Sequence, residues 1–257
     1  MINVSKGFSL ISSKLELHGI GKKISIIVPA FNEAPCLEKN IMAIREAIQR
    51  ITRSYEIILA EDGSTDGTDI VSKKLAVENP WIIHSHFAER LGKGGALKRA
   101  FRVSSGELII FMDADIATSL NCLPQMIGEI ERGYDMAIGS RRIRGSKSKR
   151  SPSRTLLSWI YNLFVRVLFG TGVYDHQCGF KAFRRNMVES VIDDVQSNSF
   201  IFDTEFIVKA KHFGYSIIEF PVIWTEPEGR LSKVILLRDG VRMGFQLLKL
   251  RVKLWKH

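Results

Sequence analysis

The sequence predicts an α/β fold built on a mostly parallel β-sheet, with helices covering both of its faces. Short apolar runs of strand length alternate along the chain with longer segments in which apolar residues recur at helical spacing. Conspicuous polar loops follow these runs, at residues 29–33, 61–68, 113–115 and 139–154. No change of composition divides the region. We therefore expect one sheet whose polar loops gather at the carboxyl ends of its strands.

Five apolar runs have the length and boundaries of buried strands, because they are too short for ordinary helices. In chain order, the expected strands cover residues 24–28, 55–60, 81–85, 108–112 and 134–138. We expect Pro29 to stop the first of them. The fourth, Leu108–Met112, is almost unbroken and leads directly into a pair of carboxylates.

Helices are expected in the segments that connect these strands. Between the first two strands, four apolar residues recur at helical spacing: Leu37, Ile41, Ile44 and Ile48. The loop 61–68 is rich in turn formers and helix caps and opens a helix over about 69–78. Further helices are expected from the glycine-rich loop 90–95 to about Val103, and near 120–131.

Two segments in the second half are predicted to be helices with large apolar surfaces. Arg154–Phe169 is apolar over most of its surface, and packing on the protein's own core or contact with a membrane explains this equally well. Over residues 233–256, an apolar stripe ending in Trp runs beside basic residues, which favours a helix lying in an anionic membrane interface. This stripe consists of Val234, Leu237, Val241, Phe245, Leu248, Val252 and Trp255. No membrane-spanning segment and no secretory signal are expected.

The net charge of +10 is concentrated in two windows of the second half. Residues 136–174 hold eight basic and no acidic residues, and residues 230–257 hold eight basic residues and one Asp, so these windows contribute +8 and +7. The rest of the chain therefore sums to 10 − 15 = −5. This local excess predicts an anionic partner, for which phosphates, anionic lipid and nucleic acid all remain candidates. The three widely separated cysteines are expected to be reduced residues of a cytosolic protein.

Charged residues near the predicted strand ends indicate a phosphate-binding site. Asp113 and Asp115 stand in one turn and offer oxygen ligands to a hard divalent cation that is shared with a substrate's phosphates. Lys93 lies between two glycines and can approach the same phosphates as a point charge. Asp62 is placed to accept hydrogen bonds from a base or ribose. Each feature alone is also typical of a plain turn, and the spacing of a P-loop is missing.

Four motifs follow one another in a fixed order: Val28–Glu33 (VPAFNE), Glu61–Thr68 (EDGSTDGT), Gly92–Gly94 (GKG) and Asp113–Asp115 (DAD). Their order and spacing resemble those of family 2 glycosyltransferases with the GT-A (Rossmann-like) fold, and the resemblance covers residues 24 to 225. Glu61 is a departure, because many members of that family carry Asp there.

Four later motifs narrow the resemblance: Gly139–Arg141, Gln177–Phe183, Phe202–Glu205 and Ser232–Val234. They look like the dolichyl-phosphate glucosyltransferase and mannosyltransferase branch. The resemblance implies an inverting enzyme that moves a hexose from a nucleotide sugar to a polyprenyl (dolichyl) phosphate, with Mg²⁺ or Mn²⁺ as cofactor. We expect a catalytic domain over residues 1–229, followed by the basic amphipathic helix of residues 230–257.

The same resemblance assigns roles to individual residues, which stand here as expectations. Nucleotide-sugar contacts are expected at Pro29, Ala30, Asn32, Glu33, Asp62, Lys93, Asp113, Ala114 and Asp115. Metal ligands are expected at Asp113, Asp115 and Gln177. The acceptor phosphate is expected at Ser140, Arg141 and Arg154, and the catalytic set at Asp115, Arg141, Asp203 and Glu205.

The chemistry of a lipid phosphate agrees with this acceptor. With a second pKa of about 6 it is largely ionised at neutral pH, so it needs bound cations rather than a general base. UDP-glucose is the favoured donor and GDP-mannose the alternative. A hydroxyl acceptor in a glycolipid or polysaccharide would instead require Asp203 or Glu205 as a base. The basic windows are mixed with large aliphatic residues, which argues against nucleic acid. We expect a peripheral protein on the cytoplasmic face of a membrane, and the sequence leaves its oligomeric state open.

Overall fold

The computed structural model describes residues 22–226 and 236–255. In these ranges the strands are β1 (Ile24–Ala30), β2 (Tyr55–Asp62), β3 (Ile82–Phe87), β4 (Leu108–Met112), β5 (Met136–Ser140), β6 (Lys147–Lys149), β7 (Phe180–Arg184), β8 (Ile217–Pro221) and β9 (Ile223–Thr225). The α-helices are α2 (Leu37–Gln49), α3 (Thr68–Glu78), α4 (Lys93–Val103), α5 (Leu123–Glu131), α6 (Pro152–Phe169), α7 (Arg185–Val191), α8 (Phe202–His212) and α9 (Leu236–Trp255). Two short 3₁₀ turns, η1 (Leu120–Cys122) and η2 (Ile192–Asp194), complete the set.

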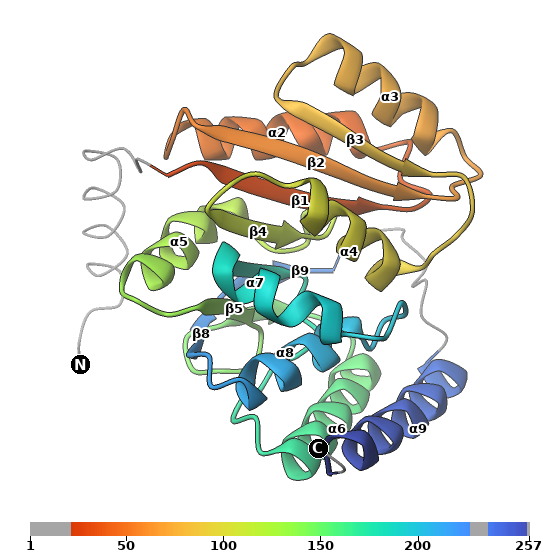
Figure 1. Ribbon diagram of the computed structural model, residues 1–257, viewed down its shortest axis with the longest axis vertical. Helices are drawn as coiled ribbons and strands as arrows, with labels where there is room; N and C mark the ends of the chain where they lie inside the picture. Colours follow the sequence, from red (N-terminus) through yellow and green to blue (C-terminus); the bar gives the residue numbers. More distant parts are fainter. Residues whose placement is uncertain (1–21, 227–235, 256–257) are drawn as a thin grey trace.

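Seven strands form one sheet in the order β3-β2-β1-β4-β7-β5-β8. All neighbouring pairs are parallel except those that β7 makes with β4 and β5, so the predicted α/β fold with a mostly parallel sheet is confirmed. Helices cover both faces of this sheet, and α6 and α9 lie side by side at one end of the molecule (Figure 1). Strands β6 and β9 form a separate small ladder.

The alternating side chains of the central strands supply both layers of the core. In β4, Ile110 packs on the side of α2 and α5, whereas Ile109 and Phe111 pack on the side of α4 and α8. All five residues of β4 are buried, as expected for a strand covered on both faces. The predicted face of α2 is also buried, because all four of its spaced apolar residues have no exposed surface.

Four strands extend further toward the candidate site than the sequence predicts, and one of them, β5, ends at Ser140 instead of residue 138. β1 continues through Pro29 to Ala30. Proline is tolerated there because the pairing of β1 with β4 ends at Ile27, so beyond that point β1 pairs only with β2. β2 includes Glu61 and Asp62, and β3 runs to Phe87 instead of ending at residue 85. The charged and cyclic residues at these ends resemble loop residues in sequence. The ladder nevertheless includes them, because backbone N–H groups donate hydrogen bonds to the two carboxylates of Glu61 and Asp62.

Helix α9 packs on α6, and a small buried cluster joins Leu247 of α9 to Val165 of α6 and to Ile201. Within residues 22–226 and 236–255, no helix is both long enough and apolar enough to cross a bilayer. The predicted domain boundary at residue 229 and the motif Ser232–Val234 lie outside the described residues.

Candidate active site

The loops after β1 and β2 are joined by hydrogen bonds from side chains to backbone. The Asn32 amide N–H donates to Ser64 Oγ at 3.2 Å, and the Asn32 side chain accepts the Thr65 N–H at 2.8 Å. Glu33 N–H donates to Thr68 Oγ1 at 2.8 Å. Asn32 has a φ of 52°, a left-handed conformation that Asn tolerates better than most residues. Two of the predicted nucleotide-binding residues, Asn32 and Glu33, are therefore bonded directly to the loop of residues 61–68.

Asp62 connects this surface to the start of α4. Its carboxylate accepts the Gly92 N–H at 2.7 Å and is almost fully buried. Burial raises the pKa of Asp62, although the hydrogen bond from Gly92 and the nearby Arg90 oppose that shift. Asp62 thus fixes the position of the glycine that precedes Lys93.

Lys93 belongs to a row of four alternating charges, in the order Asp113, Lys93, Asp203 and Lys181. Its ammonium lies 3.2 Å from Asp113 Oδ1 and 3.4 Å from Asp203 Oδ2, and Lys181 pairs with the other oxygen of Asp203. Burial opposes ionisation of Lys93, yet the two carboxylates outweigh it and raise its pKa. Burial likewise disfavours the Asp203 carboxylate, but Lys181 and Lys93 together lower its pKa. The row runs from the half-exposed Asp113 to the fully buried Lys181.

Asp113 and Asp115 flank a tight turn at the end of β4. The Asp115 carboxylate accepts the Ala117 N–H at 3.2 Å, and the Ala114 carbonyl accepts a hydrogen bond from Asn40 at 2.8 Å. Both aspartates line a small cavity together with Gly179 and Trp224. Two half-exposed carboxylates at a strand end offer the hard oxygen ligands that Mg²⁺ and Mn²⁺ take, while leaving positions for diphosphate oxygens. The donor set therefore fits the predicted cation.

Gly179 is a site residue whose role the sequence analysis missed. A Cβ atom at this position would lie 1.8 Å from Asp113 Oδ2, and the Gly179 carbonyl accepts the Asp113 N–H at 3.0 Å. The close approach of this backbone holds the Asp113 carboxylate in place. Glycine within the motif Gln177–Phe183 was the available signal, since glycine allows a backbone to come this near to another group.

Gln177, the third predicted metal ligand, has its amide nitrogen engaged on the side of α8. The NH₂ group donates to Thr204 Oγ1 at 3.0 Å and to the Phe200 carbonyl at 3.2 Å. The amide oxygen is the atom of this side chain with metal-binding chemistry, and nothing in these contacts directs it toward Asp113.

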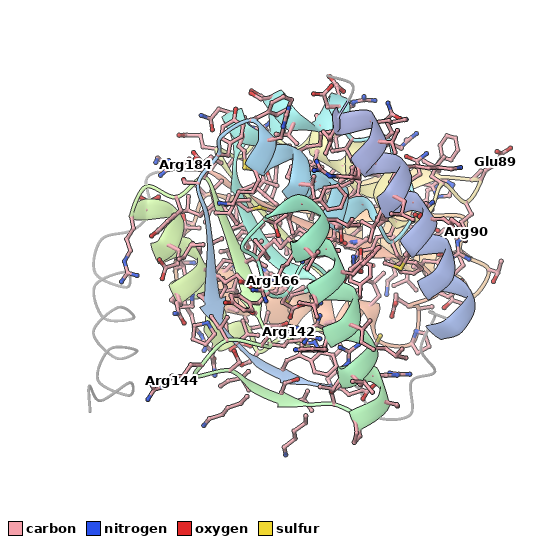
Figure 2. The ribbon with its side chains drawn as sticks, turned by 90° about the horizontal axis from the view of Figure 1, so that it is seen from below. Glu89, Arg90, Arg142, Arg144, Arg166 and Arg184 are labelled. Atoms are coloured by element: carbon pink, nitrogen blue, oxygen red, sulfur yellow. The ribbon has the colours of Figure 1, made fainter. Side chains whose placement is uncertain are left out.

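A cavity of about 570 Å³ lies between α6 and the loop after β5, and its basic lining residues are four arginines. They are Arg141, Arg142, Arg150 and Arg166. Figure 2 shows Arg142 and Arg166 beside α6, whereas Arg144 points outward at the periphery. Burial together with the nearby Arg141 charge lowers the pKa of Arg150 to about 10, and its Nε has no hydrogen-bond partner among the described residues. Like charges held together in this way form a binding site for a multivalent anion.

Arg141 is fixed by a buried partner. Its Nε and one terminal nitrogen donate to the two oxygens of Asp175 at 2.7 and 2.8 Å, and its backbone N–H donates to the same carboxylate. Burial disfavours the guanidinium, but the Asp175 charge outweighs this effect and raises the pKa of Arg141. Asp175 leaves one terminal nitrogen of the guanidinium for a ligand in the cavity.

Three other predicted residues have structural partners. Ser140 is fully buried, and Arg154 forms an ion pair with Glu226 and is not among the residues that line the arginine cavity. Glu205 accepts the backbone N–H groups of Gln196 and Ser197 at 3.0 and 2.8 Å. The sequence does not single out Arg150, because all eight basic residues of the window look alike.

Trp224 joins the two halves of the site. It lines the cavity of Asp113 and Asp115, and the guanidinium carbons of Arg141 and Arg150 lie 5.5 and 5.8 Å from the centre of its ring. A cation site and an anion site therefore meet across a single aromatic side chain.

Residues 25–192 match the sequence profile of glycosyl transferase family 2. The chain belongs to this family. It is 39% identical over 232 residues to glycosyltransferase AglD of Haloferax volcanii, covering 89% of this chain but only 37% of that protein. A polyprenol monophosphomannose synthase of Mycolicibacterium smegmatis is 30% identical over 81% of this chain and 80% of its own length. The dolichyl-phosphate beta-glucosyltransferase ALG5A of Trichomonas vaginalis is 32% identical over 91% and 75%.

Solved structures share the GT-A fold. The glucosyl-3-phosphoglycerate synthase of Mycobacterium tuberculosis, in complex with Mn²⁺ and UDP-glucose, matches with a TM-score of 0.66 and 19% identity over 93% of this chain and 82% of that one. The mannosyltransferase PcManGT of Pyrobaculum calidifontis, in complex with GDP-Man and Mn²⁺, matches with a TM-score of 0.63 and 21% identity over 98% and 71%. The family and the fold make this protein a glycosyltransferase.

Proposed function

We propose that this protein transfers a hexose, with UDP-glucose as the favoured donor, to the phosphate of a polyprenyl (dolichyl) lipid. The observation that carries the proposal is the arginine cavity, which lies across Trp224 from the Asp113–Asp115 turn. Relatives named as polyprenol and dolichyl-phosphate sugar transferases support the class of acceptor. Because such relatives use different hexoses, GDP-mannose stays the alternative donor.

The donor diphosphate would lie beside the Asp113–Asp115 turn and the neighbouring Lys93 ammonium, which is 3.2 Å from Asp113 Oδ1. A divalent cation held by these two aspartates would neutralise the diphosphate as it leaves. Lys93 is already positively charged and positioned by Asp203, so it needs no rearrangement to balance the same charge. Asp62 and the loop of residues 61–68 would contact the nucleoside.

The acceptor phosphate would bind in the arginine cavity, chiefly through Arg142 and Arg150, with Arg141 at its inner side. One phosphate oxygen attacks the anomeric carbon, a new carbon–oxygen bond forms, and the bond to the nucleoside diphosphate breaks. Attack from the face opposite the leaving group inverts the configuration. The phosphate oxygen is already ionised, so no proton has to be removed.

The charges at α8 argue against a hydroxyl acceptor. Such an acceptor needs a carboxylate that can take up a proton. Asp203 is held between two lysines that lower its pKa, and both Glu205 oxygens accept backbone N–H groups. Neither carboxylate has the properties of a general base.

The lipid chain would follow the exposed apolar side chains of α6 and α9 into a membrane. Arg166 and the other cavity arginines lie at one side of α6, and large apolar side chains cover its exposed surface. They are Leu156, Leu157, Trp159, Ile160, Leu163, Phe164 and Val167. We place the protein peripherally on the cytoplasmic face of that membrane.

The test is a transfer assay in vesicles that contain polyprenyl phosphate, with labelled UDP-glucose and GDP-mannose supplied separately. We expect a lipid-linked product with one donor, and its loss with an unphosphorylated polyprenol.

Arg142→Gln and Arg150→Gln should each raise the apparent KM for the lipid by about tenfold or more, because each removes a charge-assisted phosphate contact. Arg144→Gln, at the exposed periphery of the same loop, is the matched control (Figure 2).

The donor site is tested in the same assay with Asp115→Asn. This change should reduce transfer by about 100-fold or more and remove its dependence on added Mg²⁺ or Mn²⁺. The exposed Asp193→Asn is the control. If no label enters lipid from either donor, the acceptor class is wrong, and metal-dependent activity in Asp115→Asn would remove the turn from the mechanism.

A further inference from the structure

A second group of metal-ligating side chains lies at the edge of the sheet and is formed by Glu61, His84 and His86. One ligand atom of each residue lies within 4.8 Å of the others. Within residues 22–226 and 236–255, this is the only group of three His, Cys, Asp or Glu side chains that meets this limit. It contains neither Asp113 nor Asp115.

The β-ladder brings the three residues together. His86 on β3 lies directly opposite Glu61 on β2, and His84 is two residues before His86 on the same face. The His86 Nδ1 and Glu61 Oε2 atoms are 2.5 Å apart, and the two imidazole rings are 5.4 Å apart between centroids. Because the strands fix the backbone, side-chain rotation alone is needed to bring the ligand atoms to a common ion.

The Nε2 atom of His84 is buried and has no hydrogen-bond partner among the described residues. A buried polar atom without a partner is unfavourable and rare in native proteins. A neutral imidazole nitrogen carries the lone pair that a metal ion requires.

The other two ligands have complementary surroundings. Glu61 is 1% exposed, and its Oε1 accepts the Ser64 N–H at 2.8 Å, so a backbone group already orients the carboxylate. The His86 side chain is 44% exposed, which leaves a route from solvent and room for a water ligand. Two imidazoles, one carboxylate and an open position form a ligand set that suits Zn²⁺.

We propose that Glu61, His84 and His86 bind a Zn²⁺ ion that links the edge strand β3 to β2. Zn²⁺ bonds of about 2.0–2.2 Å place neighbouring ligand atoms about 3.3 Å apart in a tetrahedral site. The ion therefore replaces the short contact between His86 and Glu61 and gives His84 Nε2 a partner. The ion differs in chemistry from the one expected at Asp113 and Asp115, where the ligands are oxygen atoms only.

Binding of Zn²⁺ also affects the nucleotide loop, because Glu61 holds both the ion and the Ser64 N–H. Ser64 Oγ in turn accepts the Asn32 N–H at 3.2 Å. An ion that fixes Glu61 therefore restricts the motion of two hydrogen bonds in that loop, the one from Ser64 N–H to Glu61 and the one from Asn32 N–H to Ser64 Oγ. The Zn²⁺ site itself does not depend on which sugar or acceptor the enzyme uses.

The test uses full-length protein without a histidine tag, treated with a chelator and titrated with Co²⁺ and then Zn²⁺. We expect one high-affinity site per chain, a Co²⁺ absorption band typical of tetrahedral nitrogen and oxygen ligands, and displacement of Co²⁺ by Zn²⁺. Saturating Zn²⁺ should raise the Tm by several degrees, because the ion binds only the folded chain.

Four variants locate the ion. His84→Asn and His86→Asn should each weaken Zn²⁺ binding at least tenfold, whereas His212→Asn, an exposed histidine on α8, should bind as the wild type does. Asp115→Asn should also leave Zn²⁺ binding unchanged. Circular dichroism in chelator checks that each variant is folded, and the more exposed His86 decides the result if the His84 variant is unstable.

Wild-type affinity in His86→Asn would overturn the proposal. So would the absence of a 1:1 site in the wild type, or a site that is lost with Asp115→Asn but kept with both histidine variants.

Discussion

At the scale of single residues, Gly179 shows how closely the backbone limits the Asp113 carboxylate. Replacing it with Ala places a methyl group on that carboxylate, since a Cβ atom would lie 1.8 Å from Asp113 Oδ2. We expect Gly179→Ala to move Asp113 and to reduce transfer about tenfold or more, with a higher requirement for divalent cation.

The measurement is the rate of transfer against Mn²⁺ concentration. Gly244→Ala on α9, where an added Cβ meets no atom within 4 Å, is the matched control and should keep wild-type activity. An unchanged cation requirement in Gly179→Ala would contradict the role of Gly179 in placing Asp113.

His176 is a buried residue that should make stability depend on pH. Its Nδ1 and Nε2 atoms contact Asn162 Oδ1 at 2.8 Å and Thr171 Oγ1 at 2.9 Å, and burial lowers its pKa to about 3. In the unfolded chain His176 takes up a proton at about pH 6.5, whereas in the folded protein it stays neutral until the pH approaches 3. The contribution of the neutral His176 to stability is therefore complete above pH 6.5 and is lost as the pH falls toward 3. The loss should be on the order of 2 kcal/mol by pH 5.

The prediction for His176 is checked by thermal unfolding between pH 5 and 7.5. The Tm of the wild type should fall as the pH is lowered, and the fall should be smaller in His176→Asn. The exposed His212→Asn should keep the wild-type slope. Equal slopes in all three proteins would mean that other groups cause the effect.

At the scale of elements, α6 and α9 form the surface that we assign to the membrane. Val167 on α6 is 76% exposed and Phe245 on α9 is 64% exposed, while Leu247 and Leu250 bury the other side of α9. We expect Val167→Glu and Phe245→Glu each to weaken binding to vesicles with anionic lipid by about tenfold, since each removes roughly 1.5–3 kcal/mol of apolar burial.

Sedimentation with vesicles measures this binding. Val77→Glu is the control, because Val77 is 80% exposed on α3, at the end of the molecule opposite α6 and α9 (Figure 1). Normal binding of both α6 and α9 variants would assign the apolar surface to another partner.

The sequence predicted most elements because their signals are local. The spaced isoleucines of α2 and the unbroken run of β4 each specify one element from a few neighbouring residues. The antiparallel strand β7 was not predicted, although it lies between β4 and β5. Its second residue, Lys181, is buried, although in sequence a lysine resembles a surface residue until its ion pair with Asp203 is known. Long-range pairing of this kind leaves no local pattern.

At the scale of the whole molecule, the sequence predicted which loops meet but not which side chains pair within them. Lys93 and Asp113 were expected to serve the same phosphates, and the structure brings them to 3.2 Å. Among the eight basic residues of one window, composition cannot separate Arg154, which pairs with Glu226, from Arg150, which lines the cavity. Those choices depend on partners that lie more than 70 residues away in the chain.

The combined charges of the site predict how the rate depends on pH. Burial disfavours the charged forms of Asp203 and Lys93, but their oppositely charged neighbours outweigh it. The pKa of Asp203 is therefore lowered and that of Lys93 is raised. Asp203 therefore stays negative and Lys93 stays positive from pH 5 to 9, and neither titrates in that range. The group that does titrate is the acceptor phosphate, with a second pKa of about 6.

We therefore expect kcat/KM for transfer to be flat above about pH 7 and to fall up to about tenfold per pH unit well below 6. The profile is measured with saturating donor and cation, and circular dichroism at each pH separates the rate effect from the loss of stability that His176 predicts. If kcat/KM continues to rise above pH 7, a protein group must lose a proton before transfer. In that case a hydroxyl acceptor with a general base would explain the site better than a lipid phosphate.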